Sequence, residues 1–186
     1  MSKPLILGLD ISIANTGYCI GVDDIPFKTG LVQTKAKQYS EQKVLDDVHR
    51  VEFIFNELKQ LISSRVNGKP IDVIVLEGYA MSARNTSSLT TLCEIGGLVK
   101  NYLKSREIPF IIAPPTVVKK FATSKGNCKK DVVMKEVYKR WNFDTDNDNI
   151  ADAYVLMQIG RAHFHKLPAP KFQEDCLKKC VIIEGV

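Results

Sequence analysis

Two acidic residues interrupt apolar runs that are typical of buried strands. Asp10 follows the run at residues 5–9, and Glu77 follows the run at residues 71–76. A carboxylate in such a strand is costly to bury unless it is hydrogen-bonded, paired or bound to a cation. If the two strands are parallel neighbours, the carboxylates approach each other, and their repulsion raises a pKa unless cations neutralise them. These acids therefore need a partner elsewhere in the chain.

A third acid is a candidate partner for these two residues. Asp152 lies three residues after Asn149 and four after Asp148, a spacing that places their oxygens on one face of a helix. Hard oxygen ligands without histidine or cysteine favour Mg²⁺ or Mn²⁺ over Zn²⁺. Two such ions about 4 Å apart activate a water and stabilise the leaving oxygen in phosphodiester cleavage. Taken singly, each acid also has a plain interpretation as turn former, strand end or helix cap.

Basic residues are concentrated between residues 117 and 140, where eight lysines and arginines accompany only two acids. A solvated surface explains such a segment about as well as nucleic-acid binding does. Metal-bound phosphate chemistry requires both charges, so the acids and the basic segment together favour it. The DNA-binding candidates in this segment are Lys119, Lys120, Lys125, Lys129 and Lys130.

The elements that position these residues follow from hydrophobic periodicity. Residues 17–22 and 27–34 indicate two strands that form an antiparallel meander with the first. An apolar stripe from Val44 to Ile62 predicts a long amphipathic helix. This helix joins two buried strands, which makes the second parallel to the first. We expect an α/β fold with a mixed five-stranded sheet, completed by a strand at 109–113 and by helices at 88–104, 131–141 and 150–163.

Length and composition indicate a globular protein with one domain, because the 186 residues are 45% hydrophobic and 25% charged. No apolar run reaches the roughly 20 residues that span a membrane, and the N-terminus lacks the features of a signal peptide. We therefore expect a cytoplasmic protein. Five scattered cysteines argue against a disulfide framework. The expected domain covers residues 1–165, and residues 166–186 form a C-terminal tail without an assigned role.

The order of these motifs resembles that of RuvC-type Holliday junction resolvases, most closely the phage-encoded members. The resemblance covers about residues 5–160. It implies a ribonuclease H-like fold, a homodimer with two active sites, and paired incisions in four-way DNA junctions; a phage origin would place the protein in the host cytoplasm. The segments that carry it are residues 8–12 with Thr16 and Gly17, residues 73–77, residues 113–120 with Gly126, Lys129 and Lys130, and residues 148–153.

The resemblance also implies roles in the active site. Asp10, Glu77 and Asp152 would be metal-binding acids of a magnesium-dependent endonuclease, with two Mg²⁺ ions per site and Mn²⁺ as a substitute. Lys119 and Lys130 match basic positions near the scissile phosphate or on the DNA backbone. The charge of this segment predicts an affinity for DNA that falls steeply with salt.

Two further regions gain roles from the resemblance. The helix that contains Gly96 and Gly97 resembles the dimer helix of the family, and close packing would justify two glycines inside it. The loop after the second buried strand resembles the one that enters the junction centre. Tyr79 and Met81 are candidates for an apolar wedge there, and Arg84 is a further DNA-binding candidate.

One position departs from the family pattern. The fourth acid of the family lies three residues before the last aspartate, where this chain has Asn149. Asparagine keeps the shape of aspartate but loses its charge, so metal affinity should fall. Three interpretations compete: Asp148 substitutes for the acid, Asn149 is a tolerated natural ligand, or Asn149 is an engineered inactivating change. We favour the third because the exchange is isosteric.

Two alternatives to a nuclease are open. The turn from Asp10 to Gly17 also resembles the first phosphate loop of actin-like and sugar-kinase ATPases, but 186 residues are too few for their two lobes. A non-catalytic junction-binding protein with a decayed site is compatible with Asn149. Within the nuclease class, cleavage of flaps and Y-forks is the nearest variant.

Overall fold

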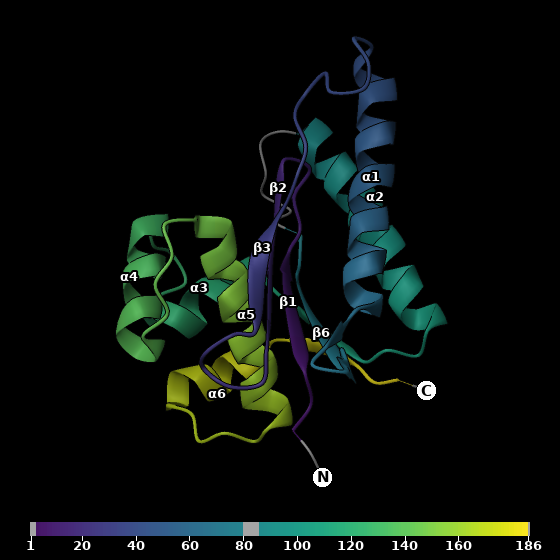
Figure 1. The fold of residues 1–186 in the computed structure, drawn as a ribbon. Helices are drawn as coiled ribbons and strands as arrows, with labels where there is room; N and C mark the ends of the chain where they lie inside the picture. Colours follow the sequence, from purple (N-terminus) through teal and green to yellow (C-terminus); the bar gives the residue numbers. More distant parts are fainter. Residues whose placement is uncertain (1–2, 80–85, 186) are drawn as a thin grey trace.

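A computed structural model describes residues 3–79 and 86–185, which form a sheet with helices packed on both faces (Figure 1). The core of this α/β fold lies between the sheet and the two helical layers. The elements are β1 (Ile6–Asp10), β2 (Asn15–Gly21), β3 (Lys28–Gln33), α1 (Lys43–Ser63), β4 (Arg65–Val66), β5 (Lys69–Pro70), β6 (Val73–Glu77), α2 (Thr86–Ser105), β7 (Phe110–Ala113), α3 (Pro115–Thr123), α4 (Lys130–Trp141), α5 (Asp148–Phe164), α6 (Lys171–Leu177) and β8 (Val181–Ile183).

The main sheet is mixed, as the sequence predicted, with the strand order β3-β2-β1-β6-β7-β8. β1, β2 and β3 form the expected antiparallel meander. β6 lies parallel to both β1 and β7. α1 leads back from β3, which runs in the same direction as β1, to β6, and α2 connects β6 with β7. The carboxyl ends of β1 and β6 therefore lie at the same edge of the sheet.

The predicted number of strands is wrong, because residues of the C-terminal tail add a sixth. β8 pairs antiparallel with β7, with Val181 opposite Ile112. Three apolar residues after two lysines and a cysteine are too short a run to show a period, so the sequence did not reveal this strand. The tail also contacts α3, since the Gln173 side chain donates a 2.9 Å hydrogen bond to the Phe121 carbonyl.

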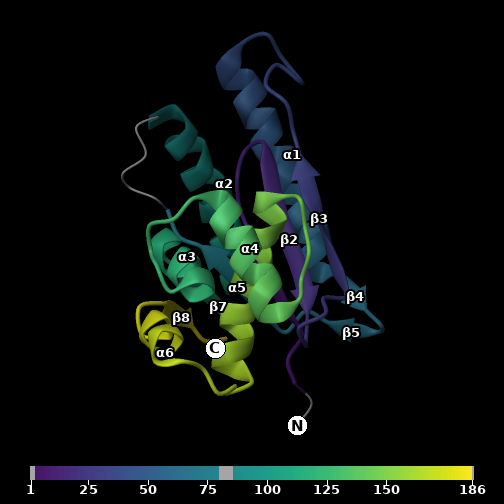
Figure 2. The ribbon, with the colours of Figure 1, turned by 90° about the vertical axis from the view of Figure 1, so that its left-hand side faces the viewer.

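The two faces of the sheet carry different helices (Figure 2). Alternate residues of a strand point to opposite faces. Leu7 and Leu9 accordingly belong to the core under α1 and α2, whereas Ile6 belongs to the core under α3 and α5. Gly8 and Asp10 share the face of Ile6. The first acid of the predicted site therefore points toward α5.

Glycines in the strands allow α5 to lie very close to the sheet. A Cβ atom on Gly8 would lie 2.6 Å from the amide nitrogen of Met157, and one on Gly17 would lie 2.5 Å from the carbonyl carbon of Asn149. Both contacts are with helix backbone, which cannot yield as a flexible side chain does. These contacts seat α5 with its N-terminal end over the carboxyl end of β1.

The apolar stripe of α1 is buried only in its second half. Ile54 and Leu58 are fully buried, but Val44 and Val48 are 78% and 55% exposed. A 21-residue helix is about 30 Å long, whereas a five-residue strand spans only about 17 Å. The first turns of α1 therefore extend past the sheet (Figure 1), and the first part of its apolar stripe is exposed there.

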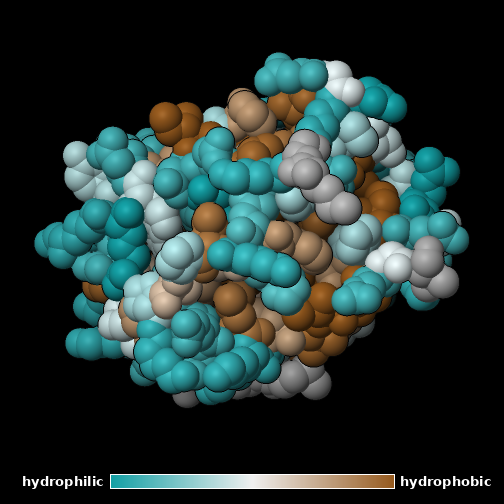
Figure 3. Space-filling view, turned by 90° about the horizontal axis from the view of Figure 1, so that it is seen from below, coloured by the Kyte–Doolittle hydropathy of each residue, from teal (hydrophilic) through white to brown (hydrophobic). Residues whose placement is uncertain are grey.

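No helix within the described ranges is long and apolar enough to cross a membrane. The end of the molecule that carries α6 presents a mainly hydrophilic surface with separate apolar patches (Figure 3). All five cysteines are free.

Candidate active site

The acids predicted from the sequence meet at one edge of the sheet. Leu9 pairs with Leu76, so the next residues, Asp10 and Glu77, lie side by side at the carboxyl ends of β1 and β6. The charge of Glu77 raises the pKa of Asp10, as expected of neighbouring carboxylates. Asp152, in the second turn of α5, is close enough for its charge to raise the pKa of both. The structure thus brings together three of the predicted metal ligands.

All three carboxyl groups hold a proton more tightly than an exposed acid does. Burial, and then the neighbouring charges of Glu77 and Asp152, hold the pKa of Asp10 well above its usual range. Burial raises the pKa of Glu77 to about 7 and that of Asp152 to about 6. A group of acids that resists ionisation in this way is stabilised by a cation, which removes both the repulsion and the cost of burying charge.

The chemistry of these donors fits a hard divalent cation, because carboxylate oxygens are the ligands that Mg²⁺ and Mn²⁺ prefer. Within the ranges that the structure describes, no three histidine, cysteine, aspartate or glutamate side chains converge into a ready-made metal site. Asp10, Glu77 and Asp152 are the residues that would hold a metal ion.

Two lysines border the acids. The pairing of β7 with β6 puts Ala113 opposite Glu77. α3 therefore begins beside the site, and Lys119 lies on this helix. Its charge opposes the effect of burial on the pKa of Glu77. Lys130 is the first residue of α4 and forms an ion pair with Asp148. Both lysines can neutralise a phosphate held at the acids.

The other predicted lysines lie farther along the same surface. Lys120 lies near Cys176 of α6. Burial raises the pKa of the Cys176 thiol, and the nearby charge of Lys120 opposes that rise. Lys125 and Lys129 are exposed in the connection between α3 and α4. A role in DNA binding stays a prediction for these three residues.

The first turn of α5 arranges the residues that precede Asp152. Asn147 caps the helix, since its side-chain oxygen accepts hydrogen bonds from the amides of Asn149 at 3.0 Å and Ile150 at 3.2 Å. A hydrogen bond from Lys130 lowers the pKa of Asp148. Asp148 is therefore engaged with Lys130, and it could replace the missing fourth acid only by leaving that ion pair.

Tyr79 packs against α2 of its own chain. Its hydroxyl donates a 3.5 Å hydrogen bond to the Cys93 carbonyl, and a Cβ atom on Gly96 would lie 3.0 Å from its ring. Lys100 places its ammonium 4.5 Å from the centre of the ring. The expected close packing at Gly96 is real, but its partner is this tyrosine. Gly97, by contrast, faces open space within the described part of the chain.

Met81 and Arg84, the other predicted residues of this loop, lie outside the described residues.

Sequence reasoning missed Arg50, a buried residue of α1. Its guanidinium donates hydrogen bonds to the Ile13 carbonyl at 3.1 Å and to the Thr34 hydroxyl at 2.9 Å, and it lies 3.7 Å from the Asp46 carboxylate. Ile13 belongs to the turn that follows Asp10, so this contact anchors the turn to α1. An arginine four residues after an aspartate on the buried side of a helix was the available signal.

The chain was compared with known proteins. No protein-family model matches it. The crossover junction endodeoxyribonuclease RuvC of Synechococcus sp. (strain CC9311) is 27% identical over 168 residues, which make up 83% of this chain and 96% of that relative. The chain is thus similar to a RuvC over most of the length of both proteins.

Solved structures of RuvC share this fold. The structure of Thermus thermophilus RuvC superposes with a TM-score of 0.62 at 15% identity, covering 82% of this chain and 90% of that one. T. thermophilus RuvC in complex with a Holliday junction substrate gives 0.58 at 15% identity, over 88% and 94% of the two chains. The ribonuclease H-like fold predicted for this chain is thereby confirmed.

Proposed function

We propose that this protein is a structure-selective DNA endonuclease that resolves four-way junctions in the cytoplasm. The observation that carries the proposal is the meeting of Asp10, Glu77 and Asp152 at one sheet edge, with Lys119 and Lys130 beside them. The relative named above is a crossover junction endodeoxyribonuclease, and one structural neighbour holds a Holliday junction substrate. Both support the same substrate class.

The acidic and the basic residues of the site would have different roles. Asp10, Glu77 and Asp152 would hold two Mg²⁺ ions, or Mn²⁺ in their place, and such ions activate a water and stabilise the leaving oxygen. Lys119 and Lys130 attract the phosphodiester, and the positive N-terminal end of α5 points to the same place.

The surface of α1 and α2 supports a homodimer as part of this proposal. Val44, Leu45 and Val48 are exposed along the first turns of α1, and Leu98 is exposed on α2. Apolar side chains that gather in this way mark an interaction surface more often than isolated ones do. A symmetric pair would place two active sites in one particle, as two incisions in one junction require.

Cleavage of labelled four-way junction, Y-fork and linear duplex in Mg²⁺ and in Mn²⁺ tests the proposal. We expect incision of the junction and no incision of the duplex. The Asp10→Asn variant is the matched control, and it should bind the junction without cutting it. If the junction binds no better than a linear duplex of equal length, the structure-selective part of the proposal is wrong.

A further inference from the structure

A cavity of about 180 Å³ adjoins the acids at the same strand ends, and Glu77 is one of the residues that line it. Leu76 lines it and points toward α2, whereas the next residue, Glu77, carries its carboxylate toward α5. The acids and the cavity thus share Glu77. This places the cavity directly beside the position that the acids offer to a phosphodiester.

The lining of the cavity combines three kinds of side chain. Leu76, Leu92 and Ile112 provide apolar walls, Tyr79 provides an aromatic ring, and Lys100 provides an ammonium group. Apolar walls, an aromatic ring and a few polar groups are the components with which proteins bind a nucleobase that has left its stack.

The tyrosine ring is held in place for such a role. Its hydroxyl donates a hydrogen bond to the Cys93 carbonyl. Gly96 leaves room for the ring, since a Cβ atom on Gly96 would lie 3.0 Å from a ring atom of Tyr79. The Lys100 ammonium covers the ring at 4.5 Å on a flexible side chain. A base can therefore displace the ammonium from the ring face, and the ammonium can then donate to the base.

We propose that this cavity receives one unstacked nucleobase beside the cleaved phosphodiester and prefers bases that carry a carbonyl oxygen. The ammonium of Lys100 has three donors and no acceptor, so it can pair with the carbonyl oxygens of guanine, thymine or cytosine. Adenine has no carbonyl oxygen. This proposal rests on the proposed function, because it takes branched DNA as the ligand.

Binding of a four-way junction that contains pyrrolo-cytosine, a fluorescent base with a carbonyl oxygen, tests the proposal. The probe is placed in turn at each position around the branch point, in Ca²⁺. We expect the emission to change by at least about twofold at one position, because unstacking alters the emission of the base. Lys100→Met and Tyr79→Leu should abolish most of that change when each variant is present at a concentration that saturates the junction.

Lys104→Met is the matched control, because Lys104 is exposed one turn farther along α2 and does not line the cavity. Junctions that differ only in the base at the responsive position complete the test. The wild-type protein should bind the adenine junction about fivefold more weakly than the guanine one, and Lys100→Met should remove that difference.

The outcomes separate the two proposals. Junction binding with no emission change at any position overturns the base-binding cavity but leaves the nuclease in place. A preference against adenine that persists in Lys100→Met overturns the role of that lysine, and an emission change of equal size in Tyr79→Leu overturns the role of the ring. Binding of the junction no tighter than of linear duplex overturns the proposed function and this inference together.

Discussion

At the scale of single residues, the acids at the ends of β1 and β6 lower the stability of the folded protein when they ionise. The pKa of Glu77 is about 7, against 4.5 for an ordinary glutamate. Between these values the folded protein keeps a proton that the unfolded chain has already lost. Folding therefore becomes less favourable as pH rises through this window, and the loss is complete above pH 7.

In the absence of divalent cations, we expect the free energy of unfolding to fall by roughly 1–3 kcal/mol between pH 5 and pH 8. Added Mg²⁺ should restore it at pH 8, since the cation binds the ionised acids. Urea unfolding in EDTA and in Mg²⁺ measures both effects. The Glu77→Gln variant should show a flatter profile, and a wild-type stability that rises over this range would contradict the raised pKa.

The Asn149→Asp variant addresses the departure from the family pattern. An added carboxylate at this position should lower the Mg²⁺ concentration needed for junction cleavage by about tenfold, because it adds a charged ligand. Cleavage rates measured over a range of Mg²⁺ concentrations provide the comparison. Asp148→Asn, which breaks the ion pair with Lys130, is the matched control and should not reproduce the gain.

Equal rates for the wild-type protein and Asn149→Asp would rule out the interpretation of Asn149 as an inactivating change. Junction binding without cleavage in both proteins would instead favour the non-catalytic alternative.

At the scale of elements, the contact between α5 and the glycines of β1 and β2 sets the position of Asp152. Gly8→Ala should cost about 1–3 kcal/mol of stability and reduce cleavage, because the new methyl group would push against helix backbone. Gly97→Ala is the control, since it lies in a helix facing open space, and it should gain about 0.5–1 kcal/mol. Urea unfolding and junction cleavage of both variants test this. Equal stability of the two would contradict the close contact.

Elements with long periodic patterns could be predicted from the sequence, and short ones could not. The helices α2, α4 and α5 lie within two residues of their expected bounds, because each presents several turns of apolar spacing. β8 and the β4–β5 hairpin have two or three residues each and carry no such period.

The candidate site was predictable in part. Asp10 and Glu77 were found because charge inside an apolar run is conspicuous. The cap at Asn147, the anchor at Arg50 and the cavity beside Tyr79 depend on contacts between distant segments, which no local pattern encodes. Periodicity also does not tell how far the sheet beneath a helix extends, so it could not predict the exposure of Val44 and Val48.

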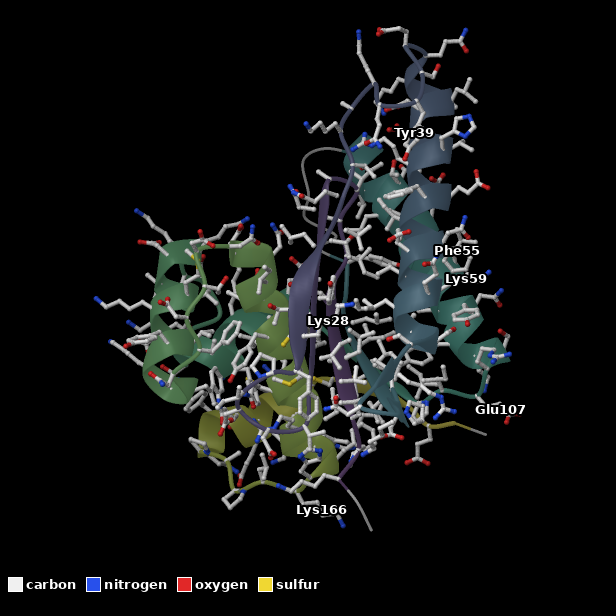
Figure 4. All side chains as sticks on the ribbon, in the orientation of Figure 1. Lys28, Tyr39, Phe55, Lys59, Glu107 and Lys166 are labelled. Atoms are coloured by element: carbon white, nitrogen blue, oxygen red, sulfur yellow. The ribbon has the colours of Figure 1, made fainter. Side chains whose placement is uncertain are left out.

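At the scale of the whole molecule, one side of the helical layer is available for a second copy. Phe55 and Lys59 face Tyr102 of α2, so the middle of α1 is occupied within the chain (Figure 4). The first turns of α1, with Val44 and Val48, extend beyond that contact. They are the part of the layer that a partner could cover.

We expect Val48→Glu to convert a dimer into monomers, because a charge would be buried at the interface. Sedimentation velocity measures the oligomeric state. Val132→Glu, which places the same change at an exposed valine of α4, should leave the dimer intact. A wild-type protein that sediments as a monomer, with or without junction DNA, would contradict the proposed assembly.

The seating of α5 on strand backbone also bears on how such a nuclease can change over generations. The separation between Asp10 and Asp152 depends on main-chain contact at Gly8 and Gly17 and not on the identity of the packing side chains. Loops, helix surfaces and tails can therefore drift without moving the acids, and a protein with only 15% of its residues in common keeps the fold. The distance between the acids is thus tied to two positions that carry no side chain, Gly8 and Gly17.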